Sequence, residues 1–294
     1  MSAHITPERW ELDDDIAKAP RVKTPKRPSR TRQTLKWAWR ILFGLSIAIA
    51  LVYLLCLSLA EGATPYLKPW PVFLSGAVCF GVTAYILRRR VAWSPAAIAS
   101  VAATVTGFVF YTAGDSCLAA AGDEYSGWFF AGAALFATGH ILLISAAVLA
   151  CVARGRRIRI DAGDITATVV AVAFAIAAAV TVSVCLSTLS VCPGGGITIG
   201  MLSLFYLLLF AVQAGVYSTC WKDRLAANAA MAGSLVLAVS DVVLLTTGDM
   251  CGDLSGTLRS YAVMLIYWAG IALIAVGPYT ELVSRAIPKK QSEI

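Results

Sequence analysis

Residues 37–60 read WAWRILFGLSIAIALVYLLCLSLA, an apolar run whose one charged residue is Arg40. A helix of this length crosses about 30 Å of hydrocarbon, because each helical residue adds about 1.5 Å. Similar runs recur along the chain, and in lipid every backbone polar group needs a partner within its own segment or a closed barrel. The alternation typical of a barrel is absent from these runs. We therefore expect eight transmembrane helices, at about residues 37–60, 70–87, 93–121, 129–153, 167–190, 197–220, 225–248 and 261–280.

The composition agrees with a membrane protein. Of the 294 residues, 59% are hydrophobic and 14% are charged, and the mean hydropathy is +0.75. A soluble domain carries about 25% charged residues. These values exclude a pair of soluble domains, a secreted disulfide framework and a disordered regulator. The expected fold class is all-α, a polytopic membrane helix bundle.

The net charge of +7 is unevenly spread and predicts the topology. With the N-terminus inside, all but two of the 24 lysines and arginines fall on the inner side, the exceptions being Lys68 and Arg259. The positive-inside rule then places both termini in the cytoplasm, and we favour the plasma (inner) membrane over an internal one. The expected domains are a disordered basic tail over 1–36, a membrane domain over 37–284 and a second cytoplasmic tail over 285–294. The first tail suits anionic lipids rather than nucleic acid.

Two segments that end the third and seventh runs share one pattern: a small residue, Asp, two residues, Leu, three residues, Gly and Asp. They are Gly114–Asp123 and Ser240–Asp249. Since four runs separate the copies, both cross the membrane in the same direction. The pattern indicates two four-helix repeats, although a match this short also arises by chance.

Asp115 and Asp241 occupy equivalent places in this pattern, so both are expected at one depth, in the outer third of the membrane. An acid inside a transmembrane helix is costly and is a candidate functional residue. The alternative is a carboxylate that caps a helix end or bonds to a nearby Ser or Thr. Two carboxylates in one partly dry cavity would hold different protonation states. That pairing supplies one acid and one base, as hydrolysis of an acid-labile bond requires.

His140 and Lys68 are further candidates for the site. His140 lies near the middle of the fourth run, where it is either a catalyst or a hydrogen-bonded core residue. Lys68 precedes the second run. It could bind a phosphate or carboxylate, pair with Asp115 or Asp241, or be an interface lysine with its head group in water.

Other polar residues in the runs have less specific roles. Tyr267 and Trp268 in the eighth run are expected to line a substrate pocket or pack in the core, and Gln213 in the sixth is expected to bond across helices. A disulfide between Cys192 and Cys251 remains open. With two histidines and no metal-ligand spacing, we expect no metal and no cofactor.

Four elements, in this order, resemble the YhhN-like transmembrane lysoplasmalogenase family over about residues 40–280. They are Lys68-Pro-Trp-Pro-Val72, Gly114-Asp115-x-x-Leu118, Phe129-x-x-Gly132-x-x-x-Phe136-x-x-x-His140, and Gly233-x-x-x-x-x-x-Ser240-Asp241. The resemblance implies cleavage of the vinyl ether bond of a lysoplasmalogen into a fatty aldehyde and a glycerophospho-alcohol. By position it marks Lys68, Asp115, His140 and Asp241. One departure concerns the substrate, because the run Tyr267-Trp-Ala-Gly-Ile271 lacks the glutamine common in the family.

Two rival functions use the same features. A proton- or cation-coupled transporter would use the same intramembrane aspartates as a relay. A non-catalytic protein would bind lysophospholipid without cleaving it. The expected partners are a lysophospholipid or plasmalogen-type lipid and the surrounding membrane lipids, and the oligomeric state stays open.

Overall fold

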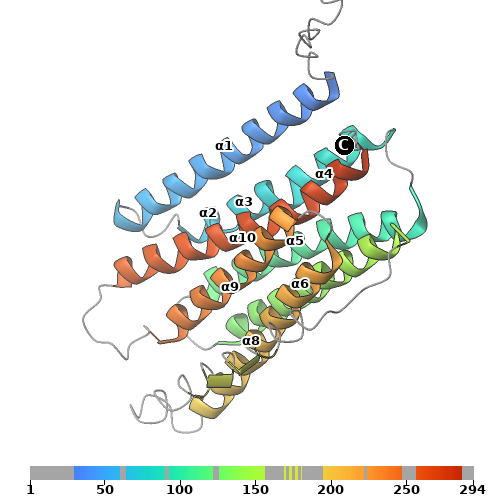
Figure 1. Cartoon of the computed structure of the whole chain (residues 1–294). Coiled ribbons are helices and arrows are strands. Elements are labelled where there is room, and N and C mark those ends of the chain that lie inside the picture. Colours follow the sequence, from blue (N-terminus) through green and yellow to red (C-terminus); the bar gives the residue numbers. More distant parts are fainter. Residues whose placement is uncertain are drawn as a thin grey trace, which may run out of the picture.

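The computed structural model describes residues 30–59, 64–89, 93–121, 126–155, 195–221, 224–246 and 256–286, with isolated positions between 169 and 180. Over these residues the chain is helical, in agreement with the all-α expectation (Figure 1). The elements are α1 (Arg30–Leu59), α2 (Thr64–Leu67), α3 (Trp70–Val72), the π-helical turn η3 (Phe73–Val78), α4 (Cys79–Leu87), α5 (Pro95–Ala121), α6 (Gly127–Val152), α8 (Gly195–Cys220), α9 (Arg224–Thr246) and α10 (Gly256–Ala286).

Six segments among the described residues are long and apolar enough to cross a membrane, and α9 adds a shorter apolar stretch, Ala226–Asp241. Each predicted run except the fifth coincides with a helix. The fifth run, over 167–190, lies outside the continuously described residues, as do Cys192 and Cys251. The count of eight therefore stays a prediction.

The first helix begins at Arg30, inside the segment that we expected to be a tail. Residues 30–36 are mostly good helix formers, Arg, Gln, Leu and Lys, so the helix continues beyond its apolar part. The apolar run alone predicts only the part of the helix that lies in lipid.

The helices pair along the chain. The α5 helix packs along α6, α9 packs along α10, and α8 contacts both α6 and α9. Their facing sides form one large core that includes Phe108, Leu143, Phe210 and Ile271.

The helix α1 lies at the edge of the bundle (Figure 1) and is held by a few polar contacts. The Trp39 indole donates to the Thr83 hydroxyl at 3.0 Å. Near the other end, the Tyr261 hydroxyl donates to the carbonyl of Leu54 at 2.6 Å. Large apolar side chains such as Ile41 and Leu55 remain more than half exposed, as a lipid-facing helix requires.

The second span is irregular. It runs through α3, η3 and α4, and its π-helical turn follows Pro69 and Pro71. The carbonyl of Pro71 accepts hydrogen bonds from the hydroxyls of Ser75, at 2.6 Å, and of Ser46 on α1, at 2.9 Å. The Pro71 carbonyl in α3, just before the π turn, thus also supplies an attachment for α1.

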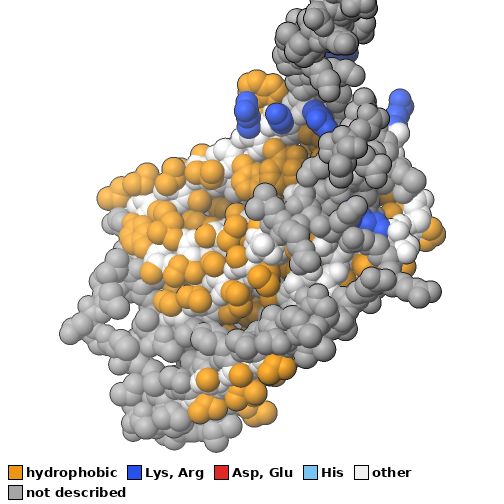
Figure 2. Space-filling view, in the orientation of Figure 1, with side chains coloured by type: hydrophobic (Ala, Val, Ile, Leu, Met, Phe, Trp, Pro, Cys, Tyr) orange, Lys and Arg blue, Asp and Glu red, His pale blue; other side chains and the backbone are white. Residues whose placement is uncertain are grey.

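Exposed cations gather at one end of the bundle. Figure 2 shows them above a broad apolar band. Arg40 on α1 lies over the Trp37 ring, 5.5 Å from its centroid, and Arg88 after α4 lies over the Tyr85 ring at 3.6 Å. The two segments meet here because α1 and α4 run in opposite directions. The topology inferred from charge places this end in the cytoplasm.

Candidate functional site

Glycines lie at the close contact between α5 and α6. A Cβ on Gly107 would lie 3.1 Å from the Gly139 carbonyl oxygen and from Leu143 Cγ. A Cβ on Gly139 would lie 2.6 Å from the Tyr111 ring. Glycine therefore allows the two backbones to approach until the side chains of one helix lie against the other. Asp115 follows one turn after Tyr111, on the same face.

The α9–α10 pair is packed in the same manner. A Cβ on Gly233 would lie 2.7 Å from the Gly270 carbonyl oxygen and 2.9 Å from Ile274 Cγ1, and a Cβ on Gly270 would lie 2.8 Å from Leu237. On each first helix a glycine, a large residue and an aspartate, here Asp241, follow at intervals of four. The agreement supports the duplication suggested by the sequence, which remains a prediction.

Asp115 is 1% exposed, in the C-terminal part of α5. The Tyr267 hydroxyl from α10 donates to its Oδ2 at 2.9 Å. Lys68, in the turn between α2 and α3, and Tyr53 on α1 lie within electrostatic range of this carboxylate. The Phe136 ring packs edge-on against Tyr267, with their centroids 6.0 Å apart. Thus two predicted substrate-binding residues, Lys68 and Tyr267, gather around a predicted catalytic one.

His140, on α6, is 2% exposed and belongs to a second polar group. Its Nδ1 lies 2.6 Å from the Tyr111 hydroxyl and 2.5 Å from Gln213 Oε1. Gln213 Nε2 donates to the Tyr217 hydroxyl at 2.6 Å, so its Oε1 is the atom that faces the histidine. An amide oxygen only accepts, so the donors beside it are His140 Nδ1 or the Tyr111 hydroxyl. The expected cross-helix bond of Gln213 is confirmed.

Asp241, on α9, is partly buried. It lies within electrostatic range of three tyrosines, Tyr111, Tyr206 and Tyr267. Its neighbour Ser240 donates to the Val263 carbonyl of α10 at 3.2 Å, which anchors this part of α9. Tyr267 therefore bonds to one aspartate and lies near the other. Both predicted carboxylates lie near one set of contacting rings, Tyr111, Phe136 and Tyr267, which we call the aromatic layer.

Trp268 points away from its neighbour Tyr267 and packs edge-on against Tyr53, with ring centroids 5.3 Å apart. Its Nε1 is buried, and no acceptor lies within hydrogen-bond reach of it among the described residues. Tyr53 in turn lies within electrostatic range of Asp115.

Sequence reasoning missed the tyrosines. Tyr111, Tyr206 and Tyr217 are buried within the bundle, and each hydroxyl contacts another helix or a polar neighbour. A signal was present in their spacing. Tyr111 precedes Asp115 by four residues, and Tyr217 follows Gln213 by four, so each tyrosine shares a helix face with a polar candidate. Tyr206 donates to the Ala133 carbonyl and carries no such signal.

The arrangement is suited to proton transfer in a dry interior. It offers two carboxylates, a tyrosine hydroxyl bonded to one of them, and an imidazole in a hydrogen-bonded group. Carboxylates and tyrosines can act as general acids and bases when they lie within reach of the reacting atom. A cation, Lys68, stands on one side of the group, where an anionic part of a ligand would be attracted.

The model of the YhhN family matches residues 77–278. The matched range contains Asp115, His140, Asp241, Tyr267 and Trp268, and it begins after Lys68. Searches of curated proteins and of solved structures found no match. The family match covers more than half of the chain, its helical architecture is that of a membrane protein, and the chain therefore belongs to the YhhN family.

Proposed function

We propose that the protein hydrolyses the vinyl ether bond of a lysoplasmalogen within the membrane. The observation that carries the proposal is the buried Asp115, bonded to Tyr267 within a layer that Asp241 also faces. Membership of the YhhN family and the resemblance to its lysoplasmalogenases supply the substrate class.

The reaction begins with transfer of a proton to the β-carbon of the vinyl ether. This gives an oxocarbenium ion, and water adds to its carbon with loss of a proton. The resulting hemiacetal separates into a fatty aldehyde and a glycerophospho-alcohol, so one water is consumed and no oxidant is needed. The reaction requires a proton donor on one side and an anionic group near the cation.

We assign these two tasks to different aspartates. Asp115 accepts the hydrogen bond of Tyr267, and an accepting carboxylate is suited to stabilise a cation and to take a proton from water. Asp241 then supplies the proton to carbon. His140, held by Tyr111 and Gln213, positions the aromatic layer between them.

The substrate would lie with its phosphate at Lys68 and its alkenyl chain between apolar helices. Lys68 is near Asp115 in electrostatic terms, so the glycerol and ether part of the lipid would fall beside that carboxylate. The Trp268 N–H is a donor available there for an oxygen of the lipid.

The test is detection by mass spectrometry of fatty aldehyde from a defined lysoplasmalogen, with purified protein in detergent. We expect Asp115→Asn and Asp241→Asn each to lower the rate by at least about 100-fold, because positioned acids and bases contribute about 10²–10⁴-fold. Ser116→Ala is the matched control, since Ser116 is the exposed neighbour of Asp115 and bonds to its own helix.

The outcomes separate the rival functions. Aldehyde from both aspartate variants at the normal rate would support the hydrolase activity and show that these two aspartates are not catalytic. A folded wild-type protein that yields no aldehyde would refute the hydrolase. Flux of protons or cations into proteoliposomes would then be measured, and a flux lost in the same variants would establish the transporter.

A further inference from the structure

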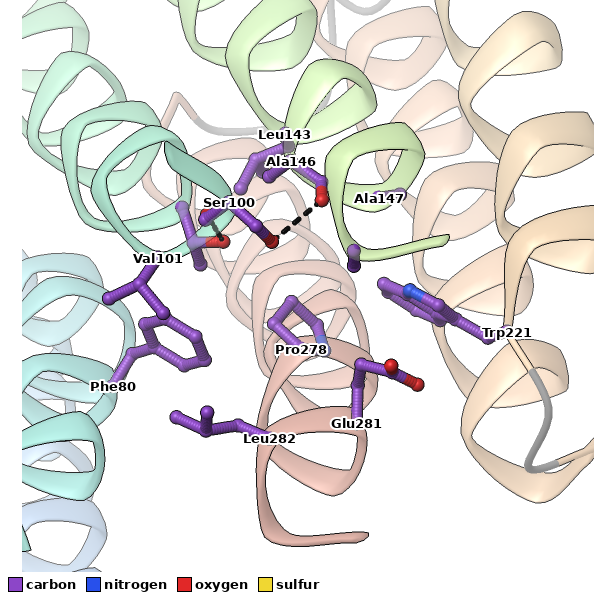
Figure 3. Close-up of a pocket in the computed structure, with 12 residues that line it drawn as sticks. Phe80, Ser100, Val101, Leu143, Ala146, Ala147, Trp221, Pro278, Glu281 and Leu282 are labelled. Atoms are coloured by element: carbon purple, nitrogen blue, oxygen red, sulfur yellow. Dashed lines mark hydrogen bonds between the residues drawn. The ribbon is translucent and has the colours of Figure 1, made fainter. Parts of the chain in front are cut away.

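A small cavity lies at the opposite end of the bundle from Asp115. It is lined by α5, α6 and α10, with Trp221 from the end of α8 and Phe80 from α4 at its sides, and it is partly open to the surface (Figure 3). Most of its wall is alanine and other apolar residues. Ser100 and Thr104 also line it, and their hydroxyls donate to the backbone carbonyls of Ala146 and Ser100 at 2.8 and 2.9 Å.

Trp221 is the unusual residue of this cavity. It is 5% exposed, yet within the described part of the chain its Nε1 has no acceptor. The indole cannot turn freely. One face stacks on Tyr217, with centroids 4.4 Å apart and planes at 12°. Its six-membered ring also occupies the space that a side chain at Gly277 would need. The donor is therefore held in place beside the cavity.

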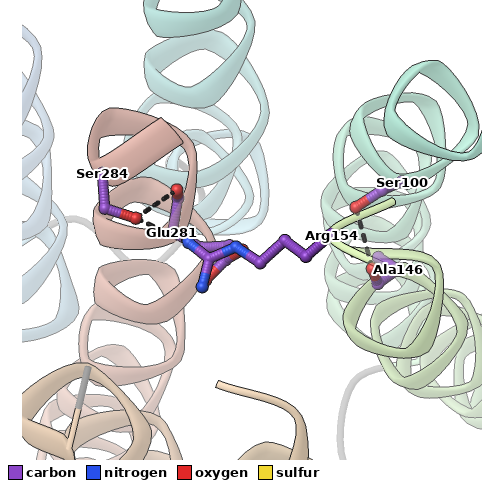
Figure 4. A network of polar contacts seen from close by, with 5 residues as sticks. All are labelled: Ser100, Ala146, Arg154, Glu281 and Ser284. Carbon is purple, nitrogen blue, oxygen red and sulfur yellow. Dashed lines mark hydrogen bonds and ion pairs between the residues drawn. The ribbon is translucent and has the colours of Figure 1, made fainter. Parts of the chain in front are cut away.

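A charged pair lies beside the cavity. Glu281, which lines the cavity, is 7% exposed and accepts from Arg154 Nε at 2.5 Å. Figure 4 shows Arg154 reaching from the end of α6 to Glu281 and Ser284 on α10. The cavity thus has an unpaired donor beside it, together with the hydroxyl oxygens of Ser100 and Thr104, which can also accept.

The ligand that fits these groups is water. It accepts from an indole N–H and donates to a carboxylate or a hydroxyl oxygen, and a buried water usually makes two to four such bonds. The cavity volume is about 20 Å³, while one buried water needs about 10–15 Å³ on the same measure. The volume is too small for a lipid chain.

The cavity lies directly inward of the histidine group. Leu143 lines it, and His140 stands three residues earlier on the same face of α6. Trp221 stacks on Tyr217, whose hydroxyl accepts from Gln213, and Gln213 contacts His140.

We propose that this cavity binds a water molecule held by Trp221 Nε1, and that it is the inner entry for the water consumed in the reaction. The binding site stands on the cavity and the unpaired donor alone. The role as an entry rests on the proposed hydrolysis.

Hydroxyl-radical footprinting of the full chain in lipid nanodiscs tests the water site, because radicals formed from bound water modify the side chains beside it. We expect Trp221 to be modified, although it is buried, and Tyr217, which is 0% exposed, to be protected. Ala147→Leu fills the cavity and should lower the modification of Trp221 at least about fivefold. Ala134→Leu, at an exposed position of the same helix, should leave it unchanged.

The same variants test the entry. Ala147→Leu should slow aldehyde formation about tenfold, and Ala134→Leu should not. If Ala147→Leu fails to fold by thermal unfolding, Ala150→Leu fills the other end of the cavity and replaces it.

A wild-type Trp221 as protected as Tyr217 would overturn the water site. Loss of modification in Ala147→Leu with an unchanged rate would overturn its role as an entry. A wild-type protein without hydrolase activity would refute the proposed function, while the footprint would still decide for or against the water site.

Discussion

A buried carboxylate such as Asp115 is stable in a bundle only when hydrogen bonds replace the water that it has lost. Tyr267 supplies such a bond, from a helix far away in the chain. Tyr111 and Gln213 likewise hydrogen-bond to the buried His140. At the scale of the residue, the site consists of groups whose partners come from other helices, so each can be tested by removing one atom.

Tyr267→Phe removes the hydroxyl and keeps the ring. Hydrogen bonds to charged groups contribute about 1.5–3 kcal/mol, so we expect the hydrolysis rate to fall roughly ten- to 150-fold, at about 1.36 kcal/mol for each factor of ten. Aldehyde formation measures it. The control is Tyr66→Phe, because Tyr66 is 77% exposed. An unchanged rate would show that Tyr267 does not position Asp115 for catalysis.

Gln213→Leu leaves His140 and Tyr217 with unsatisfied polar atoms in the core. An unsatisfied buried group costs about 1–3 kcal/mol, so the free energy of unfolding should fall by about that amount. Unfolding by SDS, followed by circular dichroism, measures it. Gln33→Leu on the exposed part of α1 should stay within about 0.5 kcal/mol of the wild type. Equal stability of the two variants would contradict the network.

The polar candidates could be predicted from the sequence because a polar or charged side chain stands out within an apolar run. Asp115, His140, Gln213 and Asp241 stand out for this reason. The tyrosines do not, since Tyr111 is as acceptable in a packed core as in a site. Which of them turns its hydroxyl to a partner depends on helix rotation, and that follows from packing between distant segments.

At the scale of the element, glycine pairs determine how near the helices come. Gly107 faces Gly139, and Gly233 faces Gly270, in two hairpins with the same order of residues. The nearest atoms at Gly233 belong to backbone, which cannot turn aside as a side chain does. This pairing keeps both aspartates on helices that contact the centre of the bundle.

Gly233→Ala should force α9 and α10 apart, because its Cβ would lie 2.7 Å from Gly270 O and Ile274 N. Overpacking of this kind costs about 1–3 kcal/mol. Thermal unfolding in detergent measures the loss. Gly81→Ala is the matched control. Nothing lies within 4 Å of its added Cβ, and alanine should stabilise that helix by about 0.5–1 kcal/mol. Similar effects of both substitutions would refute the close approach.

Hydropathy predicted the positions of the helices well but not their polar extensions or their regularity. The start of α1 at Arg30 lies outside any apolar run. The π turn in the second span follows two prolines that the sequence displays. A proline nevertheless permits several local solutions, from a kink to a bulge, and the neighbouring helices select among them.

At the scale of the molecule, one end carries exposed cations and the sides are apolar (Figure 2). The positive-inside rule then predicts a single orientation in the membrane. In the predicted orientation Lys68 and Asp115 would lie toward the outer face, and Arg154 and Glu281 toward the cytoplasm. The candidate site and the proposed water cavity would then belong to opposite halves of the bilayer.

Labelling of single introduced cysteines tests the orientation. We expect Arg89→Cys to react with a membrane-impermeant maleimide only after the cells are opened, and Gly127→Cys to react in intact cells. Both positions are exposed at opposite ends of the bundle. The unmodified chain is the control for its own cysteines. Reaction of Arg89→Cys in intact cells would reverse the topology and the assignment of both sites.

The π-helical turn η3 affects how the second half of the span, α4, is rotated about its axis. A π turn holds an additional residue, as though one had been inserted into an ordinary helix, and each residue of an α-helix turns it by about 100°. Deletion of a residue such as Ala77 would restore a regular helix and rotate α4 by that angle. Thr83 would then face away from Trp39, and Phe80 would leave the core. The additional residue therefore sets the rotation of α4 about its axis, so that its side chains meet neighbours that a regular helix would not present to them.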